Sequence, residues 1–224
     1  MMDSSIFDTK FRSRLQALST TNLSDAMDSV GIAGAVIGVR PMFHSPRVVG
    51  RAVTIKITAA GMKKSETHLG VEAIAASQPG DVIVISNHGD VKNNCWGEVL
   101  SCAAKVKGVG GVVVDGAARD IDACEEMGFP VFARAAVPIT ARGRIMQEAY
   151  NVTVRMGDVQ VSPGDVVVAD INGVVFIPPS KLEDVIVRAE SLMEKEEQMK
   201  ADLLAGMDVL AMDRKYNYEN MLKK

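Results

Sequence analysis

The sequence predicts an α/β fold with some parallel strand pairing. Between residues 80 and 133, short segments rich in Val and Ile alternate with longer segments whose apolar residues recur at helical spacing. This alternation is typical of strands that are joined by crossover helices. From Val152 to Ile177 the pattern changes to short strands with tight turns. One long helical pattern then follows, from Ser180 to Ala205.

Two short amphipathic helices are expected near the start of the chain, at Lys10–Leu18 and Leu23–Val30. The triplet Thr20–Asn22 precedes the second helix and consists of good capping residues, and Gly31 is expected to close it. Val48–Ile57 alternates between an apolar and a polar face, as a half-buried strand does.

The next segment predicts a helix, a turn and a buried strand. The helix is expected from about Ser65 to Ser77, and the turn Pro79–Asp81 leads into the apolar strand Val82–Ile85. A polar loop, Asn87–Asn94, precedes a second helix at Trp96–Lys107. The apolar stripe of this second helix is expected to consist of Trp96, Val99, Leu100, Ala103 and Val106.

The same alternation continues for one more repeat. Gly108–Gly111 interrupts the helical pattern, and Val112–Val114 follows as a buried strand. A helix is expected at Asp120–Met127 because Gly128 stops the pattern there. Pro130–Ala133 then returns as another strand.

Two turn sequences resemble each other. Ser162–Val166 repeats the pattern of Gln78–Val82, and each copy leads into a strand rich in Val and Ile. Pro fixes φ and Gly supplies unusual dihedrals in tight turns, so convergent turn chemistry explains the likeness as well as an internal duplication does.

The long C-terminal helix has two interpretations. Its apolar stripe is longer than one small core requires, which favours packing on a neighbouring subunit. A helix that lies on the sheet of its own chain explains the pattern equally well. On either view the chain divides into residues 1–179, a single α/β domain that includes the N-terminal helices, and residues 180–224, a helical arm.

Composition excludes several functional classes. The net charge is −3 and no basic stripe occurs, which argues against nucleic-acid binding. No apolar run approaches the roughly 20 residues of a membrane helix, and the first residues lack the order of a signal peptide. The three cysteines are odd in number and have no metal-type spacing. A cytoplasmic protein is therefore expected.

The most informative stretch for chemistry is Gly111–Asp120, in which a buried strand delivers a turn just before a helix. Ligands of α/β sheets bind beyond the carboxyl ends of the strands. Asp120 can offer a hard oxygen to Mg²⁺, and Arg119 can hold a carboxylate or an enolate with its planar fork. The alternative is that Asp120 only caps the next helix and that Arg119 pairs with Asp115 or Asp122 on the surface.

A second candidate is the segment Trp96–Leu100, at the start of a helix. Free N–H groups there form a site for an anion such as a substrate carboxylate. Glu98 can hold a metal-bound water or relay a proton, or it can simply be favoured by the helix dipole. The polar loop is expected to contribute to the mouth of the site through Asn87, His88, Asp90, Asn93 and Asn94.

Several other chemistries lack their motifs. Gly108–Gly111 is not the dinucleotide fingerprint, because it precedes a strand and Val113 occupies the last glycine position. No glycine-rich nucleotide-binding loop supports a methyltransferase. Lys56 lies on a polar strand face, where a Schiff-base lysine is not expected. The three histidines show no zinc spacing.

The stretch Gly108–Asp120, followed by Gly128–Arg134, resembles the hallmark of the family named for the regulator of ribonuclease activity A. This family includes the 4-hydroxy-4-methyl-2-oxoglutarate / 4-carboxy-4-hydroxy-2-oxoadipate aldolases. The resemblance extends over most of residues 20 to 180. It is carried further by the segments Leu23–Asp28, Gly50–Thr54, Pro79–Val82, Gly97–Leu100 and Ala103–Gly108.

The resemblance implies a swivelling β/β/α fold with a mixed sheet and a long C-terminal helix, assembled as homotrimers or homohexamers. It implies a site that holds Mg²⁺ or Mn²⁺ between subunits. Asp120 falls at the direct metal-ligand position, Arg119 at the enolate-stabilising position, and Glu98 at an acidic position that acts through metal-bound water. The pyruvate carboxylate is then expected to bind at Gly97, Val99 and Leu100.

The aldolases of this family also use a glutamate from the C-terminal helix of the neighbouring subunit. Glu196 is the best candidate here, with Glu194 and Glu197 as alternatives. The expected function is that of a divalent-metal-dependent class II pyruvate aldolase, a lyase that cleaves 4-hydroxy-2-oxo diacids and decarboxylates oxaloacetate. The alternative is a protein-binding regulator that inhibits ribonuclease E, and the long charged arm favours the enzyme.

Overall fold

A single long strand, β3 (Val48–Ala59), organises the sheet in the computed structural model, which describes residues 7–62 and 66–222. The first residues of β3 pair antiparallel with β13 (Val166–Asp170). Its middle pairs parallel with β4 (Val82–Ser86) on the other edge. The sheet is therefore mixed, and β3 joins its two halves.

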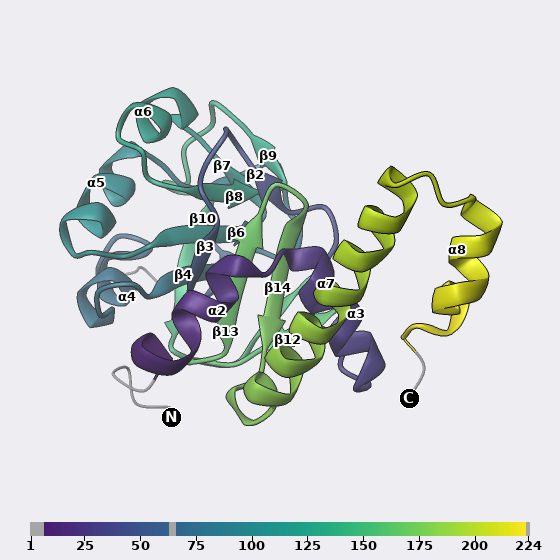
Figure 1. Ribbon diagram of the computed structural model, residues 1–224. Coiled ribbons are helices and arrows are strands. Elements are labelled where there is room, and N and C mark those ends of the chain that lie inside the picture. The colour runs from purple at the N-terminus through teal and green to yellow at the C-terminus, as the bar shows by residue number, and fades with distance from the viewer. Residues whose placement is uncertain (1–6, 63–65, 223–224) are drawn as a thin grey trace.

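The parallel half follows the alternation that the sequence predicts. β4 pairs parallel with β6 (Gly111–Asp115), which pairs parallel with β8 (Val131–Ala133). The crossovers run through α5 (Glu98–Val106) and α6 (Ile121–Glu126). These helices lie together on one face of the sheet (Figure 1). The carboxyl ends of β4 and β6 therefore point towards the loops that lead into α5 and α6.

Both faces of the parallel half are buried. In β4, Ile83 and Ile85 belong to the core beneath the helices, together with Trp96. Val82 and Val84 belong to a second core, against the antiparallel strands. Parallel strands covered on both faces have nearly continuous apolar sequences, and β4 and β6 show this pattern.

The remaining strands complete a β/β/α arrangement. β13 pairs with β14 (Gly173–Ile177), which pairs with β1 (Ala35–Val36), all antiparallel. β10 (Ile145–Tyr150) pairs with the end of β3, and β2 (Arg40–Pro41) with β8. A hairpin comprises β11 (Val154–Met156) and β12 (Val159–Val161), and a small parallel sheet comprises β5 (Asn94–Trp96), β7 (Ala117–Ala118) and β9 (Ala135–Ala136).

The two N-terminal helices differ in detail from the prediction. The first is a π-helical turn, η1 (Phe7–Phe11), that continues as α2 (Arg12–Ala17). The second helix, α3 (Thr20–Ser29), begins earlier than predicted. Its N-cap is Ser19, so the residues that were predicted to precede the helix form its first turn. Ser19 and the side chain of Asn22 form a reciprocal capping box.

Two predicted helices are shorter than expected. The helix predicted from Ser65 is only α4 (Val71–Ala76); Ser65 itself lies outside the described residues. Trp96 belongs to β5 rather than to the next helix, and this shifts the buried face of α5. Val99 and Val106 are therefore exposed, and the buried residues of α5 are Leu100, Ser101 and Ala104.

The similar turns before β4 and β13 have the same geometry. Asp81 accepts a hydrogen bond from the amide of Gln78, and Asp165 accepts one from Ser162, each at 2.8 Å. Gly80 and Gly164 both have positive φ. The two turns start β4 and β13, which both pair with β3, so the same turn geometry positions two neighbours of the central strand.

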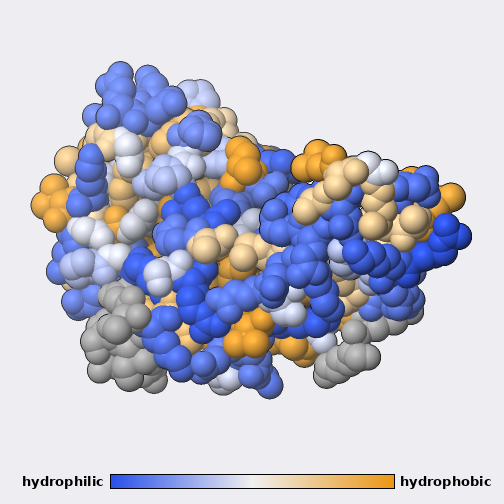
Figure 2. Space-filling view, viewed as in Figure 1, coloured by the Kyte–Doolittle hydropathy of each residue, from blue (hydrophilic) through white to orange (hydrophobic). Residues whose placement is uncertain are grey.

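The C-terminal arm begins with η2 (Pro179–Lys181) and continues as α7 (Leu182–Leu204), α8 (Val209–Tyr216) and η3 (Tyr218–Asn220). The first half of α7 lies on the sheet of its own chain and against α3. Its end and α8 project from the body, and Figure 2 shows apolar side chains gathered there. Contact of this end with another subunit stays a prediction. The buried residues of α7 are Leu182, Val185, Ile186, Ala189, Leu192 and Met199.

No helix within residues 7–62 and 66–222 is both long enough and apolar enough to cross a membrane.

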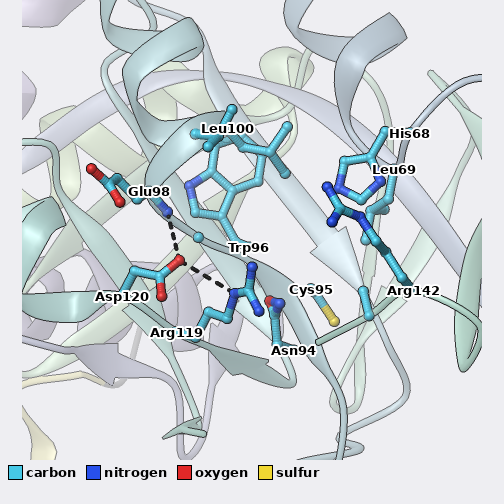
Figure 3. A pocket seen from close by; sticks show the side chains of 13 residues that line it. His68, Leu69, Asn94, Cys95, Trp96, Glu98, Leu100, Arg119, Asp120 and Arg142 are labelled. Carbon is cyan, nitrogen blue, oxygen red and sulfur yellow. Dashed lines mark hydrogen bonds and ion pairs between the residues drawn. The ribbon is translucent and has the colours of Figure 1, made fainter. Parts of the chain in front are cut away.

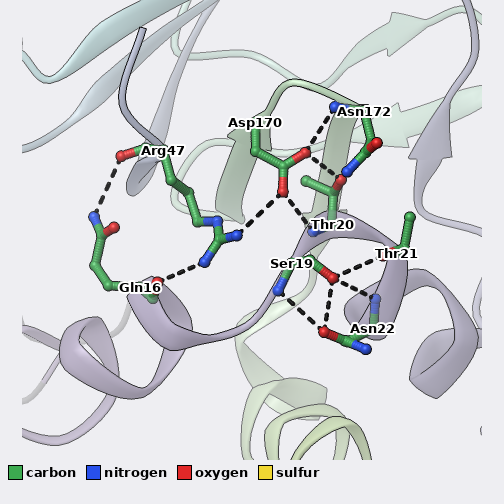
Figure 4. A network of polar contacts seen from close by, with 8 residues as sticks. All are labelled: Gln16, Ser19, Thr20, Thr21, Asn22, Arg47, Asp170 and Asn172. Carbon is green, nitrogen blue, oxygen red and sulfur yellow. Dashed lines mark hydrogen bonds and ion pairs between the residues drawn. The ribbon is translucent and has the colours of Figure 1, made fainter. Parts of the chain in front are cut away.

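One buried carboxylate connects α3 to the antiparallel strands (Figure 4). Asp170, at the end of β13, accepts hydrogen bonds from the amide and hydroxyl of Thr20 at 2.9 and 2.6 Å, and from the amide of Asn172 at 2.9 Å. The guanidinium Nη2 of Arg47 lies 3.5 Å from Oδ2 of Asp170. Burial by itself raises the pKa of Asp170, but these hydrogen bonds and the charge of Arg47 lower it below its usual value.

We expect Asp170→Ala to lower the free energy of unfolding by about 2–4 kcal/mol at pH 7, because it leaves buried donors unpaired. Since the folded-state pKa is depressed, the stabilisation is present above the unfolded pKa of about 3.9 and is lost as pH falls through the lower, folded-state pKa. Urea denaturation at pH 7 and pH 3 measures both effects. An equal loss in the exposed control Asp158→Ala would contradict the assignment.

Candidate active site

An open cavity of about 490 Å³, counting the space at its mouth, lies where α5 and α6 begin. Arg119, Asp120 and Gly97 line one side, and His68 and Arg142 lie across the cavity from Asp120 (Figure 3). The cavity therefore brings together the two segments that the sequence predicts as site candidates.

Backbone contacts hold these two segments against each other. β5 and β7 pair in parallel, and the amide of Arg119 donates a hydrogen bond to the carbonyl of Trp96 at 2.9 Å. Gly97 lies so close to the next loop that a Cβ there would lie 2.7 Å from Oδ2 of Asp120 and 3.2 Å from Cγ of Arg119. Only glycine fits this position without displacing one of the two charged side chains.

Asp120 does not act as the helix cap that the alternative interpretation requires. Its backbone is left-handed, with φ 54° and ψ 43°, and its side chain makes no capping hydrogen bond to α6. Instead Oδ2 accepts a hydrogen bond from the amide of Glu98 at 3.2 Å and lies 3.3 Å from Nε of Arg119. The Asp120 carboxylate is thus turned towards the start of α5.

Arg119 likewise does not pair with the acids named in that alternative. Asp115 is buried and accepts hydrogen bonds from Arg134 and from the amide of Gly157. The side chains of Arg119 and Asp120 keep 34% and 37% of their surface exposed, so their ion pair does not close them off from the cavity.

The start of α5 contributes backbone donors to the same cavity. Glu98, Val99 and Leu100 form its first turn and line the wall. The first amides of a helix have no intrahelical acceptor, and the helix dipole favours an anion there. The Glu98 amide already bonds to Asp120, which leaves the following amides as the candidates for the anion site that the sequence predicts.

The residues around Asp120 fit a hard divalent cation. The described part of the chain contains no group of three His, Cys, Asp or Glu side chains arranged to hold a metal ion. A single carboxylate suffices for Mg²⁺, which keeps several waters, and oxygen ligands also suit Mn²⁺. Asn94 also lines the cavity; its Oδ1 is buried and has no hydrogen-bond partner among the described residues. Such an orphaned acceptor is suited to a water or hydroxyl donor.

The sequence did not identify the opposite wall. His68 and Arg142 come from loops before α4 and before β10, and neither loop carries a recognisable motif. Partial burial lowers the pKa of His68, and the charges of Arg142 and Arg119 lower it further. Of the polar loop that was expected to form the mouth, Asn94 lines this cavity, whereas His88 lines separate hollows beside Arg155.

The cysteine in the cavity is not an activated nucleophile. Burial raises the pKa of Cys95 to about 12, so its thiolate is scarce at neutral pH. Cys124 is also buried, beside Ser101, and burial raises its pKa too. Trp96 donates to the same serine at 2.8 Å and stacks on Phe129, so this group anchors the floor of the cavity.

Glu196 does not line the cavity of its own chain. It lies on α7 and accepts a hydrogen bond from the side chain of Asn22 at 3.0 Å. Burial raises the pKa of Asp25 on α3, and the charge of Glu196 adds to the shift. Glu197 pairs with Lys200 instead. Within one chain, Glu196 therefore contacts α3, and its predicted role in a neighbouring site stays a prediction.

Comparison with known proteins identifies the family. A family model described as RraA-like, Aldolase/RraA, matches residues 20–176. This chain belongs to the RraA-like family. A Halalkalibacterium halodurans protein, provisionally named 4-hydroxy-4-methyl-2-oxoglutarate aldolase, is 36% identical to it over 192 residues, which is 85% of each chain.

Two further relatives are similar to this chain, one in sequence and one in structure. DlpA of Legionella pneumophila is 28% identical to this chain over 201 residues. The matched residues are 90% of this chain but only 33% of DlpA. RraAS2 of Streptomyces coelicolor, described as an unusual member of the RNase ES inhibitor RraA protein family, superimposes with a TM-score of 0.78 at 27% identity. That match covers 90% of this chain and 99% of RraAS2, which confirms the predicted fold class.

We expect Gly97→Ala to displace the Asp120 carboxylate, because the new Cβ would overlap it. The hydrogen bond from the Glu98 amide should then be lost, and exchange of that amide with solvent should accelerate roughly 5- to 10-fold. Amide exchange followed by NMR measures the effect. Gly110→Ala is the matched control, since its Cβ would meet no atom closer than 3.6 Å. Unchanged exchange at Glu98 would contradict the steric argument.

Proposed function

We propose that this chain is a divalent-metal-dependent class II pyruvate aldolase that cleaves 4-hydroxy-2-oxo diacids and also decarboxylates oxaloacetate. The observation that carries the proposal is the meeting of Asp120, Arg119 and the start of α5 in one cavity. A carboxylate for a cation, a guanidinium for a developing negative charge and helix amides for a carboxylate are the groups that this chemistry requires.

Each group has a distinct role in the proposal. Asp120 would hold Mg²⁺ or Mn²⁺ directly, and Glu98 would hold it through water. When bound, the metal supplies a Lewis acid for the ketone of the substrate. The amides of Val99 and Leu100 orient the carboxylate next to that ketone. Arg119 stabilises the negative charge that develops on the ketone oxygen as the carbon–carbon bond breaks.

Oxaloacetate fits the same scheme because its decarboxylation also leaves the enolate of pyruvate. Loss of CO₂ and loss of an aldehyde or ketone place the same negative charge beside Arg119. The two activities should therefore depend on the same residues.

The proposal includes assembly into a homotrimer or homohexamer in which the C-terminal arm reaches a neighbouring cavity. Exposed apolar side chains at the end of the arm, Leu204, Val209 and Leu210, support a contact between subunits. Glu196 would then supply a carboxylate to the neighbouring site.

The alternative function is binding and inhibition of a ribonuclease E, as the description of the RraAS2 relative indicates for its family. That function needs a protein-binding surface and no chemistry in the cavity. An inactive but ribonuclease-inhibiting protein would favour it over the aldolase.

We expect the purified protein with Mg²⁺ or Mn²⁺ to release pyruvate from oxaloacetate and from 4-hydroxy-2-oxo diacids, and EDTA to stop the release. Asp120→Asn and Arg119→Gln should each lower kcat by roughly 100-fold or more, because they remove transition-state charge stabilisation. Coupling to lactate dehydrogenase measures pyruvate. The exposed Asp158→Asn serves as the matched control. Full activity after chelation, or near-normal turnover in either variant, would contradict the mechanism.

Single substitutions in the C-terminal arm test which of its glutamates acts in the neighbouring site. We expect Glu196→Gln to lower kcat by about tenfold or more, because a carboxylate that relays a proton typically contributes at least that much. Glu194→Gln and Glu197→Gln, which change neighbouring positions of the same helix, should leave kcat unchanged. Equal kinetics in all three variants, with the oligomer intact by light scattering, would remove the role from Glu196.

A further inference from the structure

The cavity contains a second arginine that the proposed reaction does not use. Arg142 lines the wall opposite Asp120, and its guanidinium is paired with no carboxylate in the described part of the chain. By contrast, the guanidinium of Arg144 in the same loop bonds to the carbonyl of Thr140 at 3.1 Å. A cation that faces a cavity without a protein partner is suited to an anionic ligand.

His68 lies next to Arg142 and adds a polar group to this wall (Figure 3). Because partial burial and the two arginines lower its pKa, its imidazole is neutral at pH 7 and can donate one hydrogen bond. An anion bound between the imidazole and the guanidinium would offset the charges of Arg142 and Arg119, which disfavour the protonated form of His68.

The wall also has room for a ligand that extends beyond a pyruvyl group. His68, Leu69, Ala141 and Arg142 line a second, larger hollow as well as the first. A substrate held at Asp120 by one end can extend across the cavity towards Arg142, where the space remains open.

We propose that Arg142 and His68 bind the distal carboxylate of a dicarboxylic substrate and so make the site selective for diacids over the corresponding monoacids. The inference rests on the proposed function and deepens it by naming the part of the chain that recognises the acceptor half. Arg142 binds the carboxylate with its planar fork, and His68 donates a hydrogen bond to it. Cleavage leaves this half of the substrate as an oxo acid, held apart from the pyruvyl half at Asp120.

Two substrates that differ in a single group test the selectivity. 4-Hydroxy-2-oxoglutarate and 4-hydroxy-2-oxopentanoate both yield pyruvate, but a methyl group replaces the distal carboxylate in the second. We expect Arg142→Gln to lower the ratio of their kcat/KM values, diacid over monoacid, roughly 10- to 100-fold. Arg142→Lys should retain part of the ratio because it keeps the charge. Arg144→Gln, which removes the same charge from the same loop, should leave the ratio unchanged.

A binding measurement provides a readout that does not require turnover. 2-Oxoglutarate and 2-oxopentanoate form the corresponding pair without the 4-hydroxyl group. The chain has three histidines, so the His68 signal in NMR spectra is assigned by comparison with His68→Gln. With the metal present, 2-oxoglutarate should raise the pKa of His68 in the wild-type protein, because its distal carboxylate favours the imidazolium, and 2-oxopentanoate should not.

The outcomes separate the two proposals. If the wild-type protein releases pyruvate neither from the two hydroxy acids nor from oxaloacetate, the aldolase proposal fails. The NMR titration then still tests whether Arg142 and His68 bind a distal carboxylate. If pyruvate forms but the ratio changes less than about twofold in Arg142→Gln, or if both oxo acids shift His68 equally, the carboxylate site is overturned. Should Arg142→Gln not fold, the Lys variant and the titration of the wild-type protein decide.

Discussion

The close approach between Gly97 and the Arg119–Asp120 pair is the constraint on which the candidate site depends. The pairing of β5 with β7 brings the two segments together, and the missing side chain of Gly97 lets the Asp120 carboxylate reach the amide of Glu98. Without this approach, Asp120 would be free to cap its own helix. With it, the carboxylate, the guanidinium and the start of α5 share one cavity.

The two sides of the cavity are built differently. One side rests on the small parallel sheet and on Trp96, which is fully buried and fixed by Ser101 and Phe129. The other side, with His68 and Arg142, comes from loops. Residues on a rigid scaffold hold the reacting atoms, whereas loops vary more easily among related proteins. This division suits a site that fixes the reacting half of its substrate and recognises the other half separately, which is the arrangement that our proposals describe.

The strands and the order of elements follow from local pattern. Val82–Ile85 and Val112–Val114 are apolar throughout because helices cover one face and the antiparallel strands cover the other. That Arg119, Asp120 and Glu98 share one site was implied by the family resemblance, and the structure supplies the physical reason, because parallel strands place their carboxyl ends at the same edge. The first turn of α5 was harder to predict. Trp96 fits a helical stripe by spacing, but β5 extends through it, and the pairing with β7 overrides the local periodicity.

By itself the sequence determined the α/β class, the positions of the main helices and strands, and the pair Arg119–Asp120 as the candidate for chemistry. These features depend on hydrophobic periodicity and on turn residues, which act over a few positions. Only the tertiary structure decided which way Asp120 points, that Asp115 belongs to Arg134, and that His68 and Arg142 complete the cavity. Those contacts join loops far apart in the chain, and their geometry depends on how the strands between them pack.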